Sequence, residues 1–115
     1  MQSIIVIAIL LLAFGSLQAQ EAKKKTETFK VYGNCGMCET RIEKAVKAID
    51  GVSVADWDRD TKMIEVTFEE SKTTLDKIHQ AIADVGHDTD LKKAKDSTYD
   101  DLPGCCHYDR PEKTK

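Results

Sequence analysis

The order in which hydrophobic residues change their spacing constrains the fold of this chain more than any other feature. Alternation predicts strands, and repeats of three or four residues predict amphipathic helices. Phe29 and Val31 alternate, whereas Ile42, Ala45 and Val46 repeat with helical spacing. The expected elements are a strand at 28–32, a helix at 38–49, strands at 52–58 and 63–68, a helix at 75–85 closed by Gly86, and a short strand at 87–91.

This order of strands and helices is the split βαβ motif. We therefore expect an α+β, ferredoxin-like β-α-β-β-α-β fold, in which two helices cover one face of a four-stranded antiparallel sheet. The opposite face of the sheet and the first loop, at 33–38, would stay accessible. An amphipathic pattern of this length is sufficient for one domain.

The first nineteen residues differ from the rest because every charged residue of the chain follows position 20. Residues 4–14 form an unbroken apolar run, too short for a membrane-spanning helix of about 20 residues. Together with the small residue Ala19 it predicts a signal peptide at 1–19. An uncleaved anchor or a buried strand is the alternative. We expect an exported protein, periplasmic or extracellular, with no membrane-embedded part after cleavage.

The remainder divides by composition into a polar lead-in at 20–27, the domain at 28–91, and a charged linker with a Cys-Cys-His tail at 92–115. The net charge is −3, with 17 basic and 20 acidic residues intermixed. This balance argues against nucleic acid as a partner, because nucleic-acid binders carry a basic face. The four cysteines are then the chemistry to explain.

Cys35 and Cys38 form a C-x-x-C pair where the first strand gives way to the first helix. Unsatisfied N–H groups and the helix dipole at such a position lower the pKa of a thiol, and the thiolate is the form that binds metal. Two thiolates suit Cu(I), whereas zinc normally requires four ligands. Gly36 keeps the loop permissive, and Met37 adds a soft thioether. A structural disulfide is the alternative for this pair.

The strand at 28–32, the C-x-x-C loop, the Asp50-Gly51-Val52 turn and the pattern ending at Gly86 resemble the heavy-metal-associated domain over about 26–91. The resemblance implies metal binding at Cys35 and Cys38. The chain departs from the family's Gly-Met-x-Cys-x-x-Cys loop, because only Asn34 separates Gly33 from Cys35. His87 stands where the family approaches its metal loop, so it is a candidate third ligand; a surface or capping role is the alternative.

The tail places Cys105, Cys106 and His107 in succession, beyond the end of the resemblance. A disulfide between adjacent cysteines is strained, so these thiols could instead share a soft metal or pair with the loop cysteines. The 14 residues after Leu91 could extend about 46 Å, far enough to reach the first loop. A second metal site, completion of the first site and disulfides therefore all remain open. Completion would make zinc plausible.

The pattern as a whole predicts a metal-binding protein that is not an enzyme. We expect an exported Cu(I) carrier, chaperone or sequestering module that works by thiolate ligand exchange, with Hg(II) or Zn(II) as alternatives. Its partner would be a membrane metal transporter or a metal-accepting protein. A thiol–disulfide oxidoreductase is the competing prediction, because C-x-x-C at a helix start also suits redox exchange.

Overall fold

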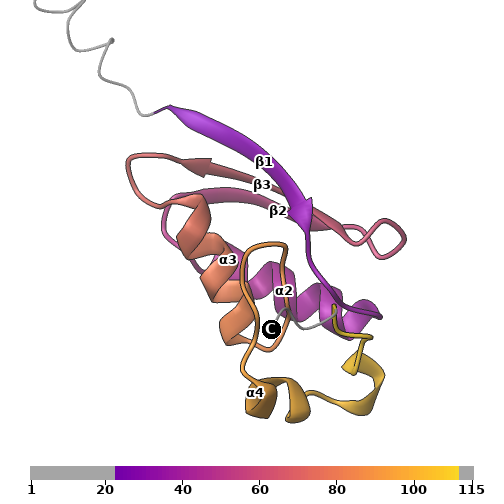
Figure 1. Ribbon diagram of the computed structural model, residues 1–115. Coiled ribbons are helices and arrows are strands. Elements are labelled where there is room, and N and C mark those ends of the chain that lie inside the picture. The colour runs from indigo at the N-terminus through magenta and orange to yellow at the C-terminus, as the bar shows by residue number, and fades with distance from the viewer. Residues whose placement is uncertain (1–22, 112–115) are drawn as a thin grey trace, which may run out of the picture.

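The computed structural model describes residues 23–111, which form a three-stranded sheet, two long helices and a C-terminal segment (Figure 1). The predicted signal peptide and cleavage site lie outside these residues. In chain order the elements are β1 (Lys24–Lys30), α2 (Gly36–Lys47), β2 (Val52–Trp57), β3 (Met63–Glu69), α3 (Leu75–Asp84), α4 (Asp96–Asp100) and the 3-10 helix η1 (Gly104–Cys106). Within the described range, no helix is long and apolar enough to cross a membrane.

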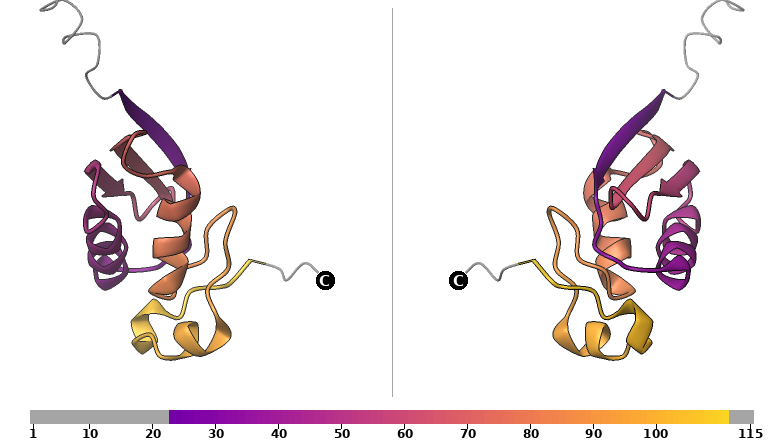
Figure 2. Two further views of the ribbon diagram at one scale, coloured as in Figure 1. Left: turned by 90° about the vertical axis from the view of Figure 1, so that its left-hand side faces the viewer. Right: turned by 90° about the vertical axis from the view of Figure 1, so that its right-hand side faces the viewer.

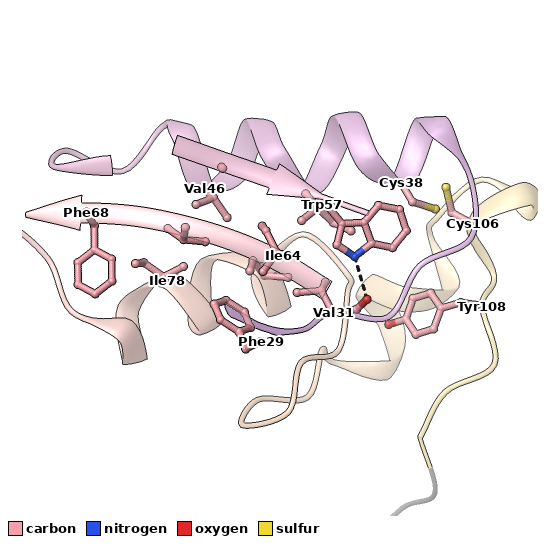
Figure 3. Close-up of a cluster of buried hydrophobic side chains, with 14 of the residues drawn as sticks. Phe29, Val31, Cys38, Val46, Trp57, Ile64, Phe68, Ile78, Cys106 and Tyr108 are labelled. Atoms are coloured by element: carbon pink, nitrogen blue, oxygen red, sulfur yellow. Dashed lines mark hydrogen bonds between the residues drawn. The ribbon is translucent and has the colours of Figure 1, made fainter. Parts of the chain in front are cut away.

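The sheet is antiparallel throughout, in the order β1-β3-β2, so β3 is the central strand. Ile64, Val66 and Phe68 of β3 are buried while Glu65 between them is exposed, as expected for a sheet with one covered face. Helices α2 and α3 contribute Ile42, Val46, Ile78 and Ile82 to the same apolar core (Figures 1 and 3). The predicted α+β order from β1 to α3 is therefore confirmed.

The predicted fourth strand at 87–91 is wrong, because the structure retains only one isolated bridge there, between Val31 and Thr89. Two backbone hydrogen bonds accompany this bridge, from the Tyr32 N–H to the Asp88 carbonyl and from the Asp90 N–H to the Lys30 carbonyl. Beyond them, side chains take the place of the ladder. The Asp90 carboxylate accepts the Lys30 N–H, and the Thr89 hydroxyl accepts the N–H groups of Leu91 and Lys92. Since these bonds turn the backbone away from β1, the sheet has three strands rather than four.

The two main helices begin and end at identifiable signals. Helix α2 starts at Gly36, two residues before the predicted start, so that Cys35 becomes its N-cap residue. Helix α3 begins after Thr74, whose hydroxyl accepts the Lys77 N–H at 3.2 Å. It ends before Gly86, which has a φ of 105° that other residues rarely adopt.

The segment after residue 91, expected to be a charged linker, folds against the domain. It forms α4 and η1, which lie beside the ends of α2 and α3 nearest the C-x-x-C loop (Figures 1 and 2). Leu102, Cys106 and Tyr108 are buried in the same core as the sheet and helices. The tail is thus part of the packed structure, and it reaches the first loop.

Candidate metal centre

The loop between β1 and α2 holds the first thiol pair. Cys35 is the N-cap residue of α2 and Cys38 lies in its first turn, with their Sγ atoms 3.6 Å apart. Cys38 is fully buried, whereas Cys35 is partly exposed. The Trp57 side chain lies under the loop and donates from Nε1 to the Val31 carbonyl at 3.0 Å (Figure 3). A Cβ at Gly33 would stand only 3.1 Å from this indole, so glycine permits the close approach.

The second thiol pair lies directly against the first. Cys105 Sγ is 3.5 Å and Cys106 Sγ 3.6 Å from Cys35 Sγ, and the two tail sulfurs are 4.0 Å apart. The sulfurs of Cys38 and Cys106 face each other across the end of α2 (Figure 3). All four cysteines are free thiols. The two thiol pairs, which are about 70 residues apart in the sequence, therefore form one cluster in the folded chain.

The four thiols differ sharply in acidity. The backbone N–H of Cys38 points toward the Cys35 sulfur, without the geometry of a capping hydrogen bond, and is the main influence that lowers the pKa of Cys35 to about 6. Burial raises the pKa of Cys38 to about 11. The pKa values of Cys105 and Cys106 are also raised, mainly by the contact with Cys35 in the first case and by burial in the second. Cys35 is thus the thiolate of the cluster at neutral pH.

The guanidinium of Arg41 lies beside the cluster, between Cys106 and the predicted ligand His87. Arg41 Nη1 donates to Cys106 Sγ at 3.3 Å and approaches His87 Nε2 at 3.5 Å. His87 is fully buried, and its Nδ1 must donate to the Tyr32 carbonyl, 2.8 Å away, because a carbonyl only accepts. Nε2 is then an acceptor facing Arg41. Burial lowers the pKa of His87 and keeps the ring neutral.

The other predicted site residues lie at different distances from the sulfurs. His107 Nε2 approaches the Asp100 carbonyl at 3.3 Å, and its ring packs on Tyr99 in α4. Met37 is exposed, with its Sδ 3.6 Å from Cys105 Sγ. A Cβ at Gly36 would have its nearest neighbour 3.9 Å away, so packing does not require glycine there. The cluster that the structure assembles consists of thiols without imidazoles.

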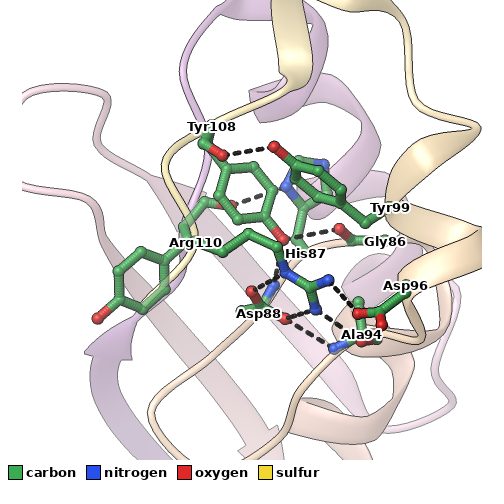
Figure 4. Close-up of polar contacts among 9 residues, drawn as sticks. Gly86, His87, Asp88, Ala94, Asp96, Tyr99, Tyr108 and Arg110 are labelled. Atoms are coloured by element: carbon green, nitrogen blue, oxygen red, sulfur yellow. Dashed lines mark hydrogen bonds and ion pairs between the residues drawn. The ribbon is translucent and has the colours of Figure 1, made fainter. Parts of the chain in front are cut away.

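Residues that the sequence analysis missed hold the tail in place. The Tyr108 hydroxyl donates to the Gly86 carbonyl at 2.8 Å and accepts the Asp88 N–H at 2.9 Å (Figure 4). Arg110 donates from Nε and Nη2 to the two oxygens of the buried Asp88 carboxylate, both at 2.9 Å. Burial alone would raise the pKa of Asp88, but the bonds from Arg110 and the Ala94 N–H outweigh it and lower that pKa. No local pattern marks these pairs, because their partners lie about 20 residues apart.

This arrangement can bind a thiophilic ion and exchange it. A partly exposed thiolate at a helix start is both a ligand and a nucleophile toward an ion held by another protein. The sulfurs of Cys105 and Cys106 lie within 4.8 Å of the Cys35 sulfur and of each other, and the Cys38 sulfur lies 3.6 Å from that of Cys35. Each of these further thiols must lose a proton to bind an ion. The chemistry of this donor set favours Cu(I), Hg(II) and Zn(II) over oxygen-preferring cations.

Known proteins agree with this chemistry. Residues 28–88 match the heavy-metal-associated domain. The mercuric transport protein periplasmic component of Pseudomonas aeruginosa is 34% identical over 73 residues, 63% of this chain and 80% of that protein. The copper chaperone CopZ of Staphylococcus saprophyticus is 38% identical over 64 residues, 55% of this chain and 94% of that one.

A solved structure agrees as well. Oxidized MerP from Ralstonia metallidurans CH34 superimposes with a TM-score of 0.56 at 34% identity, covering 58% of this chain and 94% of its own. The match to the family ends at residue 88, before α4 and the tail thiols. The paired thiols at the start of α2 and these matches together show that the chain belongs to the heavy-metal-associated domain family of metal-binding and metal-transport proteins.

Proposed function

We propose that this protein is an exported carrier or sequestering protein for a soft metal ion, with Cu(I) as the first candidate, bound at Cys35 and Cys38. The observation that carries the proposal is the partly exposed Cys35 thiol, with a pKa of about 6, 3.6 Å from a second sulfur. A thiolate available at neutral pH binds Cu(I) without first losing a proton to solvent. Its position at the end of the domain leaves it open to a partner's thiolate.

The mechanism that this geometry supports is ligand exchange. Cys35 attacks an ion held by a donor, and buried Cys38 supplies a second sulfur as the donor's ligand departs. Delivery reverses these steps when an acceptor thiolate attacks the ion from the exposed side of Cys35. A membrane metal transporter or another metal-accepting protein is the proposed partner. The chain would act as a carrier and not as an enzyme, because the ion passes through unchanged.

Hg(II) is the second candidate ion. The observation in its favour is that several relatives of this chain, from Pseudomonas aeruginosa and other organisms, are named mercuric transport protein periplasmic component. The same names support a periplasmic location, which agrees with the signal peptide predicted at 1–19. Thiolates bind Hg(II) as well as Cu(I), so the loop pair serves either ion.

Competitive titration of the reduced full chain with Cu(I), Hg(II) and Zn(II) tests the proposal. In the Cys35→Ser variant we expect the affinity for the preferred soft ion to fall about 100-fold or more, since a serine hydroxyl is a poor ligand for such ions. His107→Ala is the matched control, and its affinity should stay at the original value. Circular dichroism and Trp57 fluorescence report whether each variant folds.

Two outcomes would contradict the proposal. Tight binding retained in Cys35→Ser, but lost in the Cys105→Ser/Cys106→Ser variant, would place the site in the tail. Catalytic turnover of a disulfide substrate without metal would favour a thiol–disulfide oxidoreductase. In that case Cys35→Ser would abolish turnover while metal affinity stayed low throughout.

A further inference from the structure

The tail thiols contact the loop thiols, although the match to the heavy-metal-associated domain ends at residue 88, before the tail. Cys105 and Cys106 both contact Cys35, and Cys106 also faces Cys38 (Figure 3). We propose that all four cysteines form one closed thiolate site, in which the tail supplies the third and fourth ligands. Such a site takes a tetrahedral, thiolate-preferring divalent cation such as Zn(II), as well as a soft ion. This inference rests on the proposed function because it uses the same loop thiols.

The distances between sulfurs support a coordination number above two. A metal–sulfur bond of 2.3 Å sets sulfurs about 3.8 Å apart in a tetrahedral site, about 4.0 Å in a trigonal site and about 4.6 Å in a linear site. The separations between Cys35 and its three neighbours are 3.5–3.6 Å, and Cys105 and Cys106 are 4.0 Å apart. These values lie near the tetrahedral and trigonal edges and well below the linear one. The sulfurs of Cys35, Cys105 and Cys106 lie within 4.8 Å of one another, so an ion reaches these three with small side-chain movements. Cys38, whose Sγ is 3.6 Å from that of Cys35, supplies the fourth ligand after a larger movement of its side chain.

The tail is positioned before any ion binds. Tyr108 is buried two residues after Cys106, and its hydroxyl joins the Gly86 carbonyl to the Asp88 N–H. Arg110 then pairs with buried Asp88 through two hydrogen bonds (Figure 4). These contacts hold the chain after η1, and buried Leu102 holds it before η1, so ordering the tail costs little free energy when an ion binds. The packing of the tail against the domain therefore holds Cys105 and Cys106 at the loop.

Charge at the cluster also suits four thiolates. A divalent cation with four thiolates carries a net charge of −2, which is costly beside a buried core. Arg41 Nη1 already donates to Cys106 Sγ at 3.3 Å and so offsets part of this charge. His87 Nε2 faces the same guanidinium at 3.5 Å, and its own Nδ1 is bound to the Tyr32 carbonyl. His87 therefore positions the Arg41 guanidinium, and the metal ligands are the cysteine sulfurs.

A closed site changes how the ion is released. Two loop thiolates alone leave an ion open to attack from the solvent side of Cys35. In the four-thiolate form Cys105, which already contacts Cys35 and Met37, would be bound to the ion beside that opening. A partner must then displace the tail thiols before it takes the ion. The four-thiolate form favours retention, and the two-thiolate form favours transfer.

Zinc-loaded, reduced full chain provides a direct test without substitution. Alkylation with iodoacetamide at about pH 8, read by mass spectrometry, should label exposed Cys105 in the metal-free protein at least about tenfold faster than after Zn(II) has bound, since a metal-held thiolate is a weaker nucleophile. X-ray absorption at the zinc edge should show four sulfur neighbours. Cys105 labelled at the same rate with and without Zn(II), or two sulfur neighbours, would overturn the inference.

A variant pair separates this inference from the proposed function. Cys105→Ser/Cys106→Ser should lower Zn(II) affinity about 100-fold or more, because zinc then keeps only two thiolates. The His107→Ala variant changes the same tail without removing a sulfur and should keep full affinity. Unchanged Zn(II) affinity in the double variant would overturn the four-thiolate site alone. Loss of the proposed function would appear instead as unchanged Cu(I) and Hg(II) affinity in Cys35→Ser. Should the double variant fail to fold, Cys105→Ser at the exposed position gives the same comparison.

Discussion

The two thiol pairs meet at one point but are positioned by different means. Cys35 and Cys38 owe their places to a local rule, since they flank the first turn of α2 and the chain between them is helical. Cys105 and Cys106 lie beyond the residues that match the family and depend on contacts with Gly86 and Asp88. One pair is fixed by its own helix, and the other by a tail anchored at a distance.

The acidity of the loop thiols and the positioning of the tail thiols therefore have separate causes. The helix start gives Cys35 a low pKa whether or not the tail is present, because its main cause is the Cys38 backbone N–H. The tail adds sulfurs without adding another acidic thiol, as both tail pKa values are raised. Changes to the tail anchor should therefore leave the loop chemistry intact while they open the cluster.

Removing the anchoring cation should have the largest effect on the tail. Arg110→Ala leaves the Asp88 carboxylate buried without its main partner, and we expect the free energy of unfolding to fall by about 3 kcal/mol. Urea unfolding followed by Trp57 fluorescence measures this change. Arg59→Ala is the control, because its ion pair with Glu39 at 3.8 Å is exposed and worth under about 1 kcal/mol.

The pH dependence of the same variant sharpens this test. In the original protein the pKa of Asp88 is lowered, so its stabilising contribution is present at neutral pH and is lost as acid protonates the carboxylate. Without Arg110, burial raises that pKa instead, and protonation relieves the penalty. The difference in stability between the two proteins should thus shrink as the pH falls toward 4. An equal loss of stability at pH 7 and pH 4 would contradict the assigned role of this ion pair.

The sequence predicts the loop site better than the tail for a physical reason. Strand alternation and helical spacing are local, so β1 to α3 and the position of the C-x-x-C pair follow from short windows. Whether a fourth strand forms depends on the acceptor of the Lys30 N–H, and here the Asp90 carboxylate accepts it in place of a backbone carbonyl. The bond between Arg110 and Asp88 joins the segment at 92–115, which composition assigns to a charged linker and tail, to a domain residue 22 positions earlier. Such a pair has no periodic sequence pattern, so it can be identified only from the folded structure.

A smaller change at the anchor removes one atom. Tyr108→Phe deletes the hydroxyl between the Gly86 carbonyl and the Asp88 N–H, and we expect a loss of about 1–2 kcal/mol in the free energy of unfolding. Tyr32→Phe removes the same atom from a tyrosine beside the loop and should cost under about 0.5 kcal/mol. The tail should also label faster at Cys105 in the Tyr108 variant only. Equal stability losses in both variants would show that the hydroxyl has no special role as an anchor.

The acidity of the two pairs gives the finest comparison, because it needs no change to the protein. With a pKa of about 6, Cys35 is about nine-tenths thiolate at pH 7, whereas Cys105, with its pKa raised by the contact with Cys35, is mostly protonated. A thiolate of low pKa is intrinsically the weaker nucleophile, which offsets part of this difference in ionisation. We therefore expect metal-free, reduced Cys35 to react with iodoacetamide about tenfold faster than Cys105 at pH 7.

The pH profile identifies the cause of that difference. The Cys35 rate should rise through pH 6 and level off, because the thiol is then fully ionised, while the Cys105 rate should keep rising beyond pH 8. Substituting the tail thiols in Cys105→Ser/Cys106→Ser should shift the Cys35 profile only slightly upward, since the helix N–H remains its main stabilising partner. A Cys35 profile that moved to the ordinary thiol range in this variant would mean that the tail, and not the helix start, creates the thiolate.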